Sequence, residues 1–115
     1  MTRRVVILVR SNPEESHRAG EGVRIALGLV SGDHTVEIIL TDKAPLLLTP
    51  EVEELIDGEM TEKFLTTLKE FIPAFYVDKT STGTIDLSDT DYKVIPLSQE
   101  EIAEKIAAAD IFSVF

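Results

Sequence analysis

Two patterns of apolar residues alternate along the chain. Short runs rich in Val, Ile and Leu are typical of strands buried on both faces, whereas apolar residues recurring every three or four positions are typical of helices that bury one side. Strands are predicted at residues 3–11, 35–41, 74–78 and 111–115. Helices are predicted at residues 13–30, 50–57, 60–72 and 99–109. Residues 84–87 form a candidate short strand, and residues 93–97 form a further short apolar run.

Capping residues mark the ends of two of these helices. Asn12 is a good N-cap and Glu15 stands where a capping box needs it, so the first helix is predicted to begin there. Gly32 is the predicted C-cap of the same helix. Ser98 and Glu101 repeat the capping-box spacing before the last helix. The sequence therefore predicts two helices whose first turns are closed by side chains.

The order of the predicted elements defines the fold class. Strands that alternate with helices lie parallel, are joined by right-handed crossovers and have helices on both faces of the sheet. A chain of 115 residues has room for one core. We therefore expect a single α/β domain over residues 1–115, a three-layer sandwich around a mostly parallel sheet of five strands.

Two features of the sequence bear on packing and assembly. Three glycines in the first predicted helix each lower helix propensity by roughly 1 kcal/mol relative to Ala, which a close approach to the sheet or to a neighbouring chain would explain. The apolar run 46–48 and the aromatics Phe112 and Phe115 have no obvious place in one small core. Either they tuck under the sheet edge or they form a subunit interface. The three glycines are Gly20, Gly22 and Gly28.

Charge and cysteine content exclude several classes of protein. The net charge of −10 arises wholly in residues 44–115, and a nucleic-acid binder would need a basic face instead. The five arginines all lie in the first 24 residues, which leaves room for a local anion site. No cysteine is present, so disulfides, thiolate metal sites and thiol nucleophiles are excluded. The apolar run 5–9 is too short for a signal h-region or a membrane span, and we expect a cytoplasmic protein.

The candidate site follows from the predicted sheet. Open α/β sheets bind ligands beyond the carboxyl ends of their strands, which here are followed by residues 10–12, 41–44 and 78–82. We expect a ligand-binding pocket among the polar side chains that follow the first and third strands. These are Arg10, Ser11, Asn12, Asp78, Lys79 and Thr80.

Several specific chemistries lack the residues they need. The loop after the first strand has no glycines to wrap a phosphate, so no flavin, nucleotide or other cofactor is expected. Ordinary helix capping is favoured over anion binding in this loop, and Arg10 is the residue whose charge could reverse that preference. Asp78 resembles the acceptor of receiver domains, but no acid follows the first strand to hold Mg²⁺. His17 lies near two glutamates, yet a charged helix face is favoured over a metal site, and no metal is expected. Ser11 and Ser81 lack a convincing base for a catalytic triad.

The acidic stretch at residues 86–91 has one further interpretation. Asp86, Asp89 and Asp91 superficially resemble a calcium loop, but neither the turn glycine nor the closing glutamate stands at the required position. A solvated acidic turn is favoured.

Taken together, these segments resemble the DsrE/DsrF-like family, whose fold is shared with the TusBCD sulfur-relay subunits. The likeness is carried by "VVILVRSNPEESHRAGEGVRIALGL", by "FYVDKTS" and by the closing "AADIFSVF", and it spans nearly the whole chain. It implies a flavodoxin-like fold that assembles into homo- or hetero-oligomers, here a homodimer, trimer or hexamer. In sulfur-carrying members a cysteine in the loop after the third strand holds a persulfide. The nearest positions in this chain are Asp78 and Lys79.

Because neither side chain can hold a persulfide, the resemblance implies a non-catalytic oligomeric subunit that binds or scaffolds, with sulfur-transfer proteins as partners. Two alternatives remain open. One is a binder of a small molecule or anion, such as a sulfur oxyanion, which the arginines permit. The other is an enzyme of unknown type in the same pocket, with Lys79 as a desolvated base or with Arg10 and Lys79 as an anion clamp.

Overall fold

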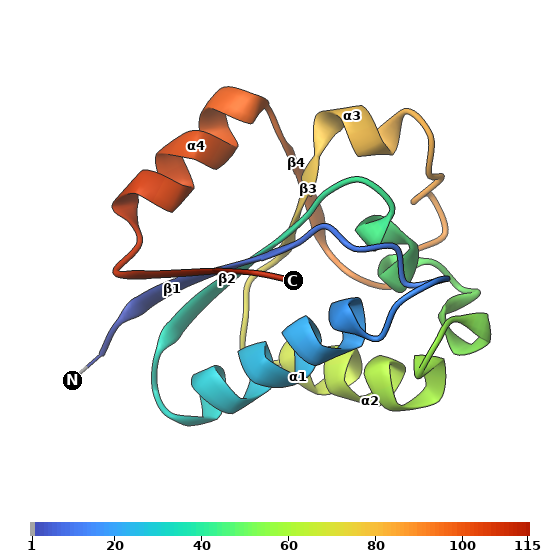
Figure 1. Cartoon of the computed structure of the whole chain (residues 1–115), viewed down its shortest axis with the longest axis horizontal. Coiled ribbons are helices and arrows are strands. Elements are labelled where there is room, and N and C mark those ends of the chain that lie inside the picture. Colours follow the sequence, from blue (N-terminus) through green and yellow to red (C-terminus); the bar gives the residue numbers. More distant parts are fainter. Residues whose placement is uncertain (1) are drawn as a thin grey trace.

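The computed structural model describes residues 2–115, which form a sheet with helices on both faces (Figure 1). Every pair of neighbouring strands in the sheet is parallel. The strand order is β4-β3-β2-β1-β5. The strands are β1 Arg4–Val9, β2 Thr35–Leu40, β3 Phe75–Asp78, β4 Val94–Leu97 and β5 Ile111–Val114. The expected α/β sandwich with a five-stranded sheet is confirmed, and all of its strands are parallel.

The helices complete three layers. On one face of the sheet lie α1 (Arg18–Ser31) and α2 (Gly58–Leu68), and on the other lies α4 (Gln99–Ala108) (Figure 1). The short α3 (Lys79–Thr82) follows β3 directly. Two 3₁₀ turns, η1 (Ala44–Leu48) and η2 (Val52–Glu54), connect β2 to α2. None of the described helices is long and apolar enough to cross a membrane.

Alternation along the strands divides the core between the two faces. Val5, Ile7 and Val9 of β1 point to the α1 and α2 side and belong to the larger buried cluster, whereas Val6 belongs to a smaller cluster with Ile102 of α4. Strands with apolar residues on both sides are what a sheet covered on both faces requires. The smaller cluster leaves the α4 face less completely covered than the other.

An ion cluster fastens α4 to the sheet. Glu37 of β2 accepts from Arg4 Nη2 at 2.8 Å and from Lys105 Nζ of α4 at 2.5 Å, and the Lys105 ammonium also lies 4.3 Å from the centre of the Tyr76 ring. Burial opposes ionisation of Glu37, but the hydrogen bonds from Lys105 and Arg4 outweigh it and hold the pKa of Glu37 below its ordinary value. The carboxylate is therefore charged and fully paired at neutral pH.

The first helix begins six residues after the predicted cap. Asn12 does not cap it; its Oδ1 accepts from Glu14 N at 2.9 Å and closes a turn instead. The Pro13 carbonyl accepts from Ile56 N, and His17 forms a pair with Asp57, so tertiary contacts with the chain before α2 hold residues 13–17 out of the helix. The prediction of Gly32 as C-cap is confirmed, as is the capping box of Ser98 and Glu101.

Three other predicted elements differ from the structure. Residues 50–57, predicted to be a helix, contain only the turn η2, and the helix predicted at residues 60–72 begins at Gly58. Residues 84–87 form no strand, and the fourth strand is the apolar run at β4. The last strand was expected to be buried, yet most of it is exposed because it lies at the edge of the sheet. The helix predicted to run to residue 72 ends at Leu68, and Phe71 beyond its end is 63% exposed.

Half of the glycines and leucines noted above lie in the core of this chain: Gly22, Leu47 and Leu48 are buried, whereas Gly20 and Leu46 are half-buried and Gly28 is exposed. A Cβ on Gly22 would lie 3.1 Å from a methyl of Val9, so this glycine lets α1 approach the sheet. A Cβ on Gly28 would meet nothing within 4 Å. Leu47 and Leu48 are buried in the larger core cluster, whereas Phe112 remains 41% exposed. Packing within the chain therefore accounts for the leucines but not for Phe112.

Candidate functional site

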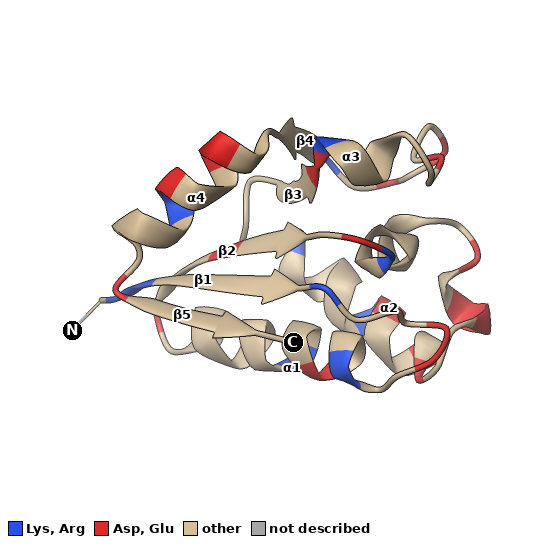
Figure 2. Ribbon diagram, turned by 45° about the horizontal axis from the view of Figure 1, so that its top comes forward, with Lys and Arg blue, Asp and Glu red and all other residues tan. Residues whose placement is uncertain are grey.

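The carboxyl ends of the strands meet at one edge of the sheet, as parallel strands require. In Figure 2 the arrowheads of β1, β2 and β5 point the same way, toward the loops on that side. The chain after β1 and β2 leads to helices on the α1 and α2 face, whereas after β3 it turns to α3, which lies on the α4 side (Figure 1). A crevice between loops that diverge to opposite faces is where open α/β sheets bind ligands. The fold thus points to the loops after β2 and β3.

The residues after β1 hold the end of that strand. The main-chain N–H groups of Arg10 and Ser11 both donate to the carbonyl of Phe115, which binds this loop to the end of the chain described here. Arg10 is exposed. The Ser11 hydroxyl is buried and has no hydrogen-bond partner within residues 2–115. Asn12 is occupied by its turn with Glu14. Of the three, Arg10 is the one with a free charged group at the surface.

Asp78 ends β3 and caps α3. Its side chain is buried, at 6% exposed. One carboxylate oxygen accepts from Thr80 N at 3.0 Å, and the other accepts from Gln99 Nε2 of α4 at 2.6 Å. Both oxygens are therefore used in joining β3, α3 and α4. Lys79 and Thr80, the next two residues, are exposed.

The structure does not bring the six predicted site residues into one cluster. They fall into two groups, after β1 and after β3, and β2 lies between those strands. At roughly 4.8 Å between neighbouring strands, the two strand ends are about 10 Å apart. A cavity of about 260 Å³ lies beside the second group, lined by Asp42, Lys43, Thr80, Ser81 and Thr84. Thr80 is the one predicted site residue in its lining.

Ser81 is the unusual member of that cavity. It is 4% exposed, and its hydroxyl has no partner within the described chain. Buried hydroxyls are ordinarily hydrogen-bonded, and rotation of the Ser81 side chain toward the cavity would let its hydroxyl bond to a ligand or water there. Lys43, on the loop after β2, supplies a positive charge to the same cavity, and Asp42 beside it supplies a negative one. The geometry fits a small polar molecule between the loops after β2 and β3.

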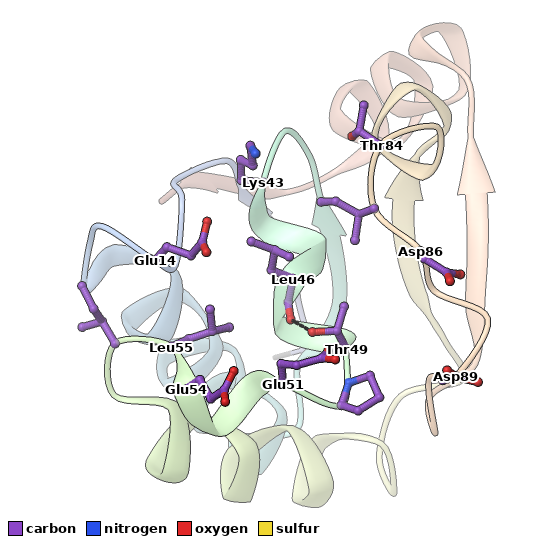
Figure 3. A pocket seen from close by; sticks show the side chains of 13 residues that line it. Glu14, Lys43, Leu46, Thr49, Glu51, Glu54, Leu55, Thr84, Asp86 and Asp89 are labelled. Atoms are coloured by element: carbon purple, nitrogen blue, oxygen red, sulfur yellow. Dashed lines mark hydrogen bonds between the residues drawn. The ribbon is translucent and has the colours of Figure 1, made fainter.

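A larger cleft adjoins this cavity and shares Lys43 and Thr84 with it. It has a volume of about 750 Å³, and Figure 3 shows side chains from three separate parts of the chain converging on it. Leu46, Leu55, Ile56 and Ile85 contribute apolar side chains to its lining. Its acidic residues are Glu14, Glu51, Glu54, Asp86 and Asp89.

The lining of the cleft is strongly negative. Lys43 is its one lysine, against the five carboxylates. Main-chain and side-chain hydrogen bonds from Ser88 hold the pKa of Asp86 below its ordinary value, so this carboxylate is charged at neutral pH. Among residues 2–115 no three histidine or carboxylate side chains are placed to hold a metal ion. His17 pairs with Asp57 at 2.6 Å, and this hydrogen bond raises the pKa of His17.

The sequence predicted the edge of the sheet and one residue of the smaller cavity, Thr80, but it did not single out the other residues that line the two cavities. Lys43 and Ser81 lie in loops that follow the predicted strands, and the position of each loop was the available signal. The acidic cleft had no such signal, because Glu14, Glu51 and Asp86 are far apart in the sequence and only the fold brings them together.

The fold and site define an open, parallel α/β domain of the doubly wound kind, with its cavities at the carboxyl edge of the sheet. The model of the DsrE/DsrF-like family matches residues 3–114, and the chain belongs to this family. The structure is similar to the crystal structure of the YchN protein from E. coli, with a TM-score of 0.76 and 19% sequence identity over 100% of both chains. That likeness is one of fold. No curated protein sequence matches the chain.

Proposed function

We propose that this chain is a non-catalytic, oligomeric DsrE/DsrF-like subunit of the cytoplasm, which binds or scaffolds beside sulfur-transfer proteins and does not carry sulfur itself. The observation that supports this most strongly is the state of Asp78. The resemblance places a sulfur-carrying cysteine in the loop after β3, and here that loop begins with a carboxylate whose two oxygens hold Thr80 and Gln99.

The chemistry of sulfur transfer explains why this replacement matters. A persulfide forms when a thiolate attacks sulfane sulfur, and it needs a sulfur atom on the protein to keep the new S–S bond. The 115 residues contain no cysteine. A role that requires binding alone does not meet this obstacle, and the fold and the cavities are compatible with it.

The proposed ligand site lies at the carboxyl edge of the sheet. It comprises Arg10, Ser11 and Asn12 after β1 and Asp78, Lys79 and Thr80 after β3, with Lys43 between them on the loop after β2. Lys79 is exposed, so the desolvated surroundings that a catalytic lysine base requires are not found. This favours binding over catalysis.

Sulfur loading and molar mass together test the proposal. The purified chain is incubated with inorganic polysulfide and analysed by intact mass spectrometry, with Lys79→Cys as a control that supplies an exposed thiol in the same loop. We expect added sulfur on the control alone, and light scattering at tens of micromolar should show an oligomer. Stable sulfur on the unsubstituted chain would refute the non-carrier role, and a monomer would refute the oligomeric one.

A second function is favoured by the unpaired hydroxyl of Ser81. Beside Lys43 it could bind an oxyanion of sulfur, with the ammonium supplying charge and the hydroxyl donating a hydrogen bond. Thiosulfate, sulfite and sulfate serve as probes in thermal-shift titrations. We expect a saturable rise in melting temperature that Lys43→Ala abolishes and Lys69→Ala, far from the cavity, preserves. If the anions still raise the melting temperature of Lys43→Ala, Arg10→Ala and Lys79→Ala, they bind outside the proposed site.

A further inference from the structure

The outer edge of β5 is an apolar strand edge with which no other strand of the described chain pairs. Ile111, Phe112 and Val114 are 45%, 41% and 39% exposed. β5 pairs with β1 on one side only, so its other side is the free edge of the sheet (Figure 2). By their register with Val6 and Leu8, Phe112 and Val114 point to the α4 face, where Leu8 beside them is itself only partly buried.

The main chain of β5 is as open as its side chains. Phe115 N donates to Leu8 O and Arg10 N donates to Phe115 O, which fixes the alternation of the ladder with β1. In a parallel pair every second residue bonds to the neighbouring strand, so the N–H and C=O groups of Phe112 and Val114 point outward. The one outward group with a partner among residues 2–115 is the Val114 carbonyl, which accepts from Arg18 Nη2 at 3.3 Å.

The opposite edge of the same sheet is protected. β4 carries Pro96, which is exposed and has no N–H to offer another strand, and Lys93 directly precedes the strand. Proline and lysine on edge strands are devices by which proteins prevent unwanted pairing. β5 has neither device, and its four residues are uncharged. One edge is thus closed to other strands and the other is open.

Charge favours a second copy of this chain as the occupant of the open edge. The chain has a net charge of −10, yet residues 111–115 carry no charged side chain, so two copies can meet here without opposing carboxylates. Asp110 precedes β5, whereas Arg18 lies at its other end, on the Val114 carbonyl. A two-fold axis would turn one strand antiparallel to the other and bring each Asp110 toward the other copy's Arg18.

We propose that β5 pairs with β5 of a second copy about a two-fold axis, joining two sheets into one. The proposal rests on the oligomeric assembly proposed above and assigns it a contact surface. The outward groups of Phe112 and Val114 then bond to those of Val114 and Phe112 in the other copy, and Ser113 faces itself on the axis. The Phe112 N–H of the second copy replaces Arg18 at the Val114 carbonyl, which frees the guanidinium for Asp110.

A single introduced cysteine tests the register. Because the chain has no cysteine, Ser113→Cys carries one thiol, and on the axis its Cα would lie roughly 4.5 Å from its symmetry mate, within the range that a disulfide spans. Under mild oxidation we expect Ser113→Cys to form a covalent dimer. Ser31→Cys, an exposed position at the end of α1, should remain uncross-linked. Absence of cross-linking at position 113 would overturn the proposed register.

A charged substitution tests the contact independently. Val114→Lys places an ammonium in the pairing, and we expect light scattering to show the molar mass reduced twofold, while Phe71→Lys leaves it unchanged. Circular dichroism verifies that both variants fold. If Val114→Lys does not fold, the cross-linking of Ser113→Cys alone tests the β5 contact. An unchanged mass for folded Val114→Lys would refute the β5 contact and leave the oligomer itself standing. A wild-type monomer would refute both.

Discussion

Asp78 offers a direct test of whether the loop after β3 is a structural junction. We expect Asp78→Ala to be destabilising, because it removes the N-cap of α3 and the bridge to Gln99 of α4 together. Asp78→Asn, which keeps an acceptor for Thr80 N but loses the charge, should be affected about half as strongly.

The magnitude follows from the two hydrogen bonds. Loss of an N-cap lowers the free energy of unfolding by about 1 kcal/mol, and loss of a hydrogen bond to a charged group by about 1.5–3 kcal/mol. Gln99 is exposed and can turn its amide to water, so the lower end applies to the second contribution. The sum for Asp78→Ala is about 2–3 kcal/mol, and for a domain of this size the melting temperature should fall by roughly 10 °C.

A double-mutant cycle with Gln99→Ala measures the bridge itself. Urea unfolding followed by circular dichroism gives the free energy of unfolding for wild type, both single variants and the double variant. Because the two side chains are in contact, we expect a coupling energy of about 1 kcal/mol. If the single effects add to within about 0.4 kcal/mol, or if Asp78→Ala unfolds like wild type, the junction assigned to Asp78 is wrong.

Three further predictions concern stability. Gly58→Ala should lower the free energy of unfolding by about 1–3 kcal/mol, since its Cβ would collide with the Val52 carbonyl. Gly28→Ala adds a Cβ in open space, so it should raise the free energy of unfolding by up to about 1 kcal/mol. Urea unfolding of both variants decides the sign of each effect. The pKa of Glu37 is lowered by its partners, so its stabilisation is present above pH 4.5 and is lost as the pH falls through the folded-state pKa; the difference between wild type and Glu37→Gln, measured across acid titration, should shrink below that pH. Ser98→Ala should lower the free energy of unfolding by about 1 kcal/mol through loss of the capping box, and thermal melts of the variant against wild type test this.

The sequence was most informative where local and global preferences agree. The apolar runs of β1 and β2 fit a sheet covered on both faces, and the capping box at Ser98 needs only neighbouring residues to form. Residues 13–17 show the opposite case. Their capping signals favour a helix, but contacts of Pro13 and His17 with residues 56–57 outweigh them, and those contacts exist only after folding.

The candidate site was predictable in location and not in composition. Parallel strands place their carboxyl ends together, so the edge follows from the order of elements. The separation of Arg10 from Lys79 depends on which strand lies between β1 and β3, and a list of elements does not contain that order. The use of Asp78 as a cap depends likewise on Gln99, 21 residues away.

The pairing of β1 with β5 has a consequence for how the chain folds. Arg4 N donates to the side chain of Asp110, 106 residues later, so the interior strand β1 has an unsatisfied side until nearly all of these residues have been made. Contacts of such long range form late and slow folding. During synthesis the still unpaired edge of β1 can pair with β5 of another nascent chain, which would yield a strand-swapped dimer. Prompt pairing of β5 with β1 therefore protects each chain from exchanging strands with its neighbours.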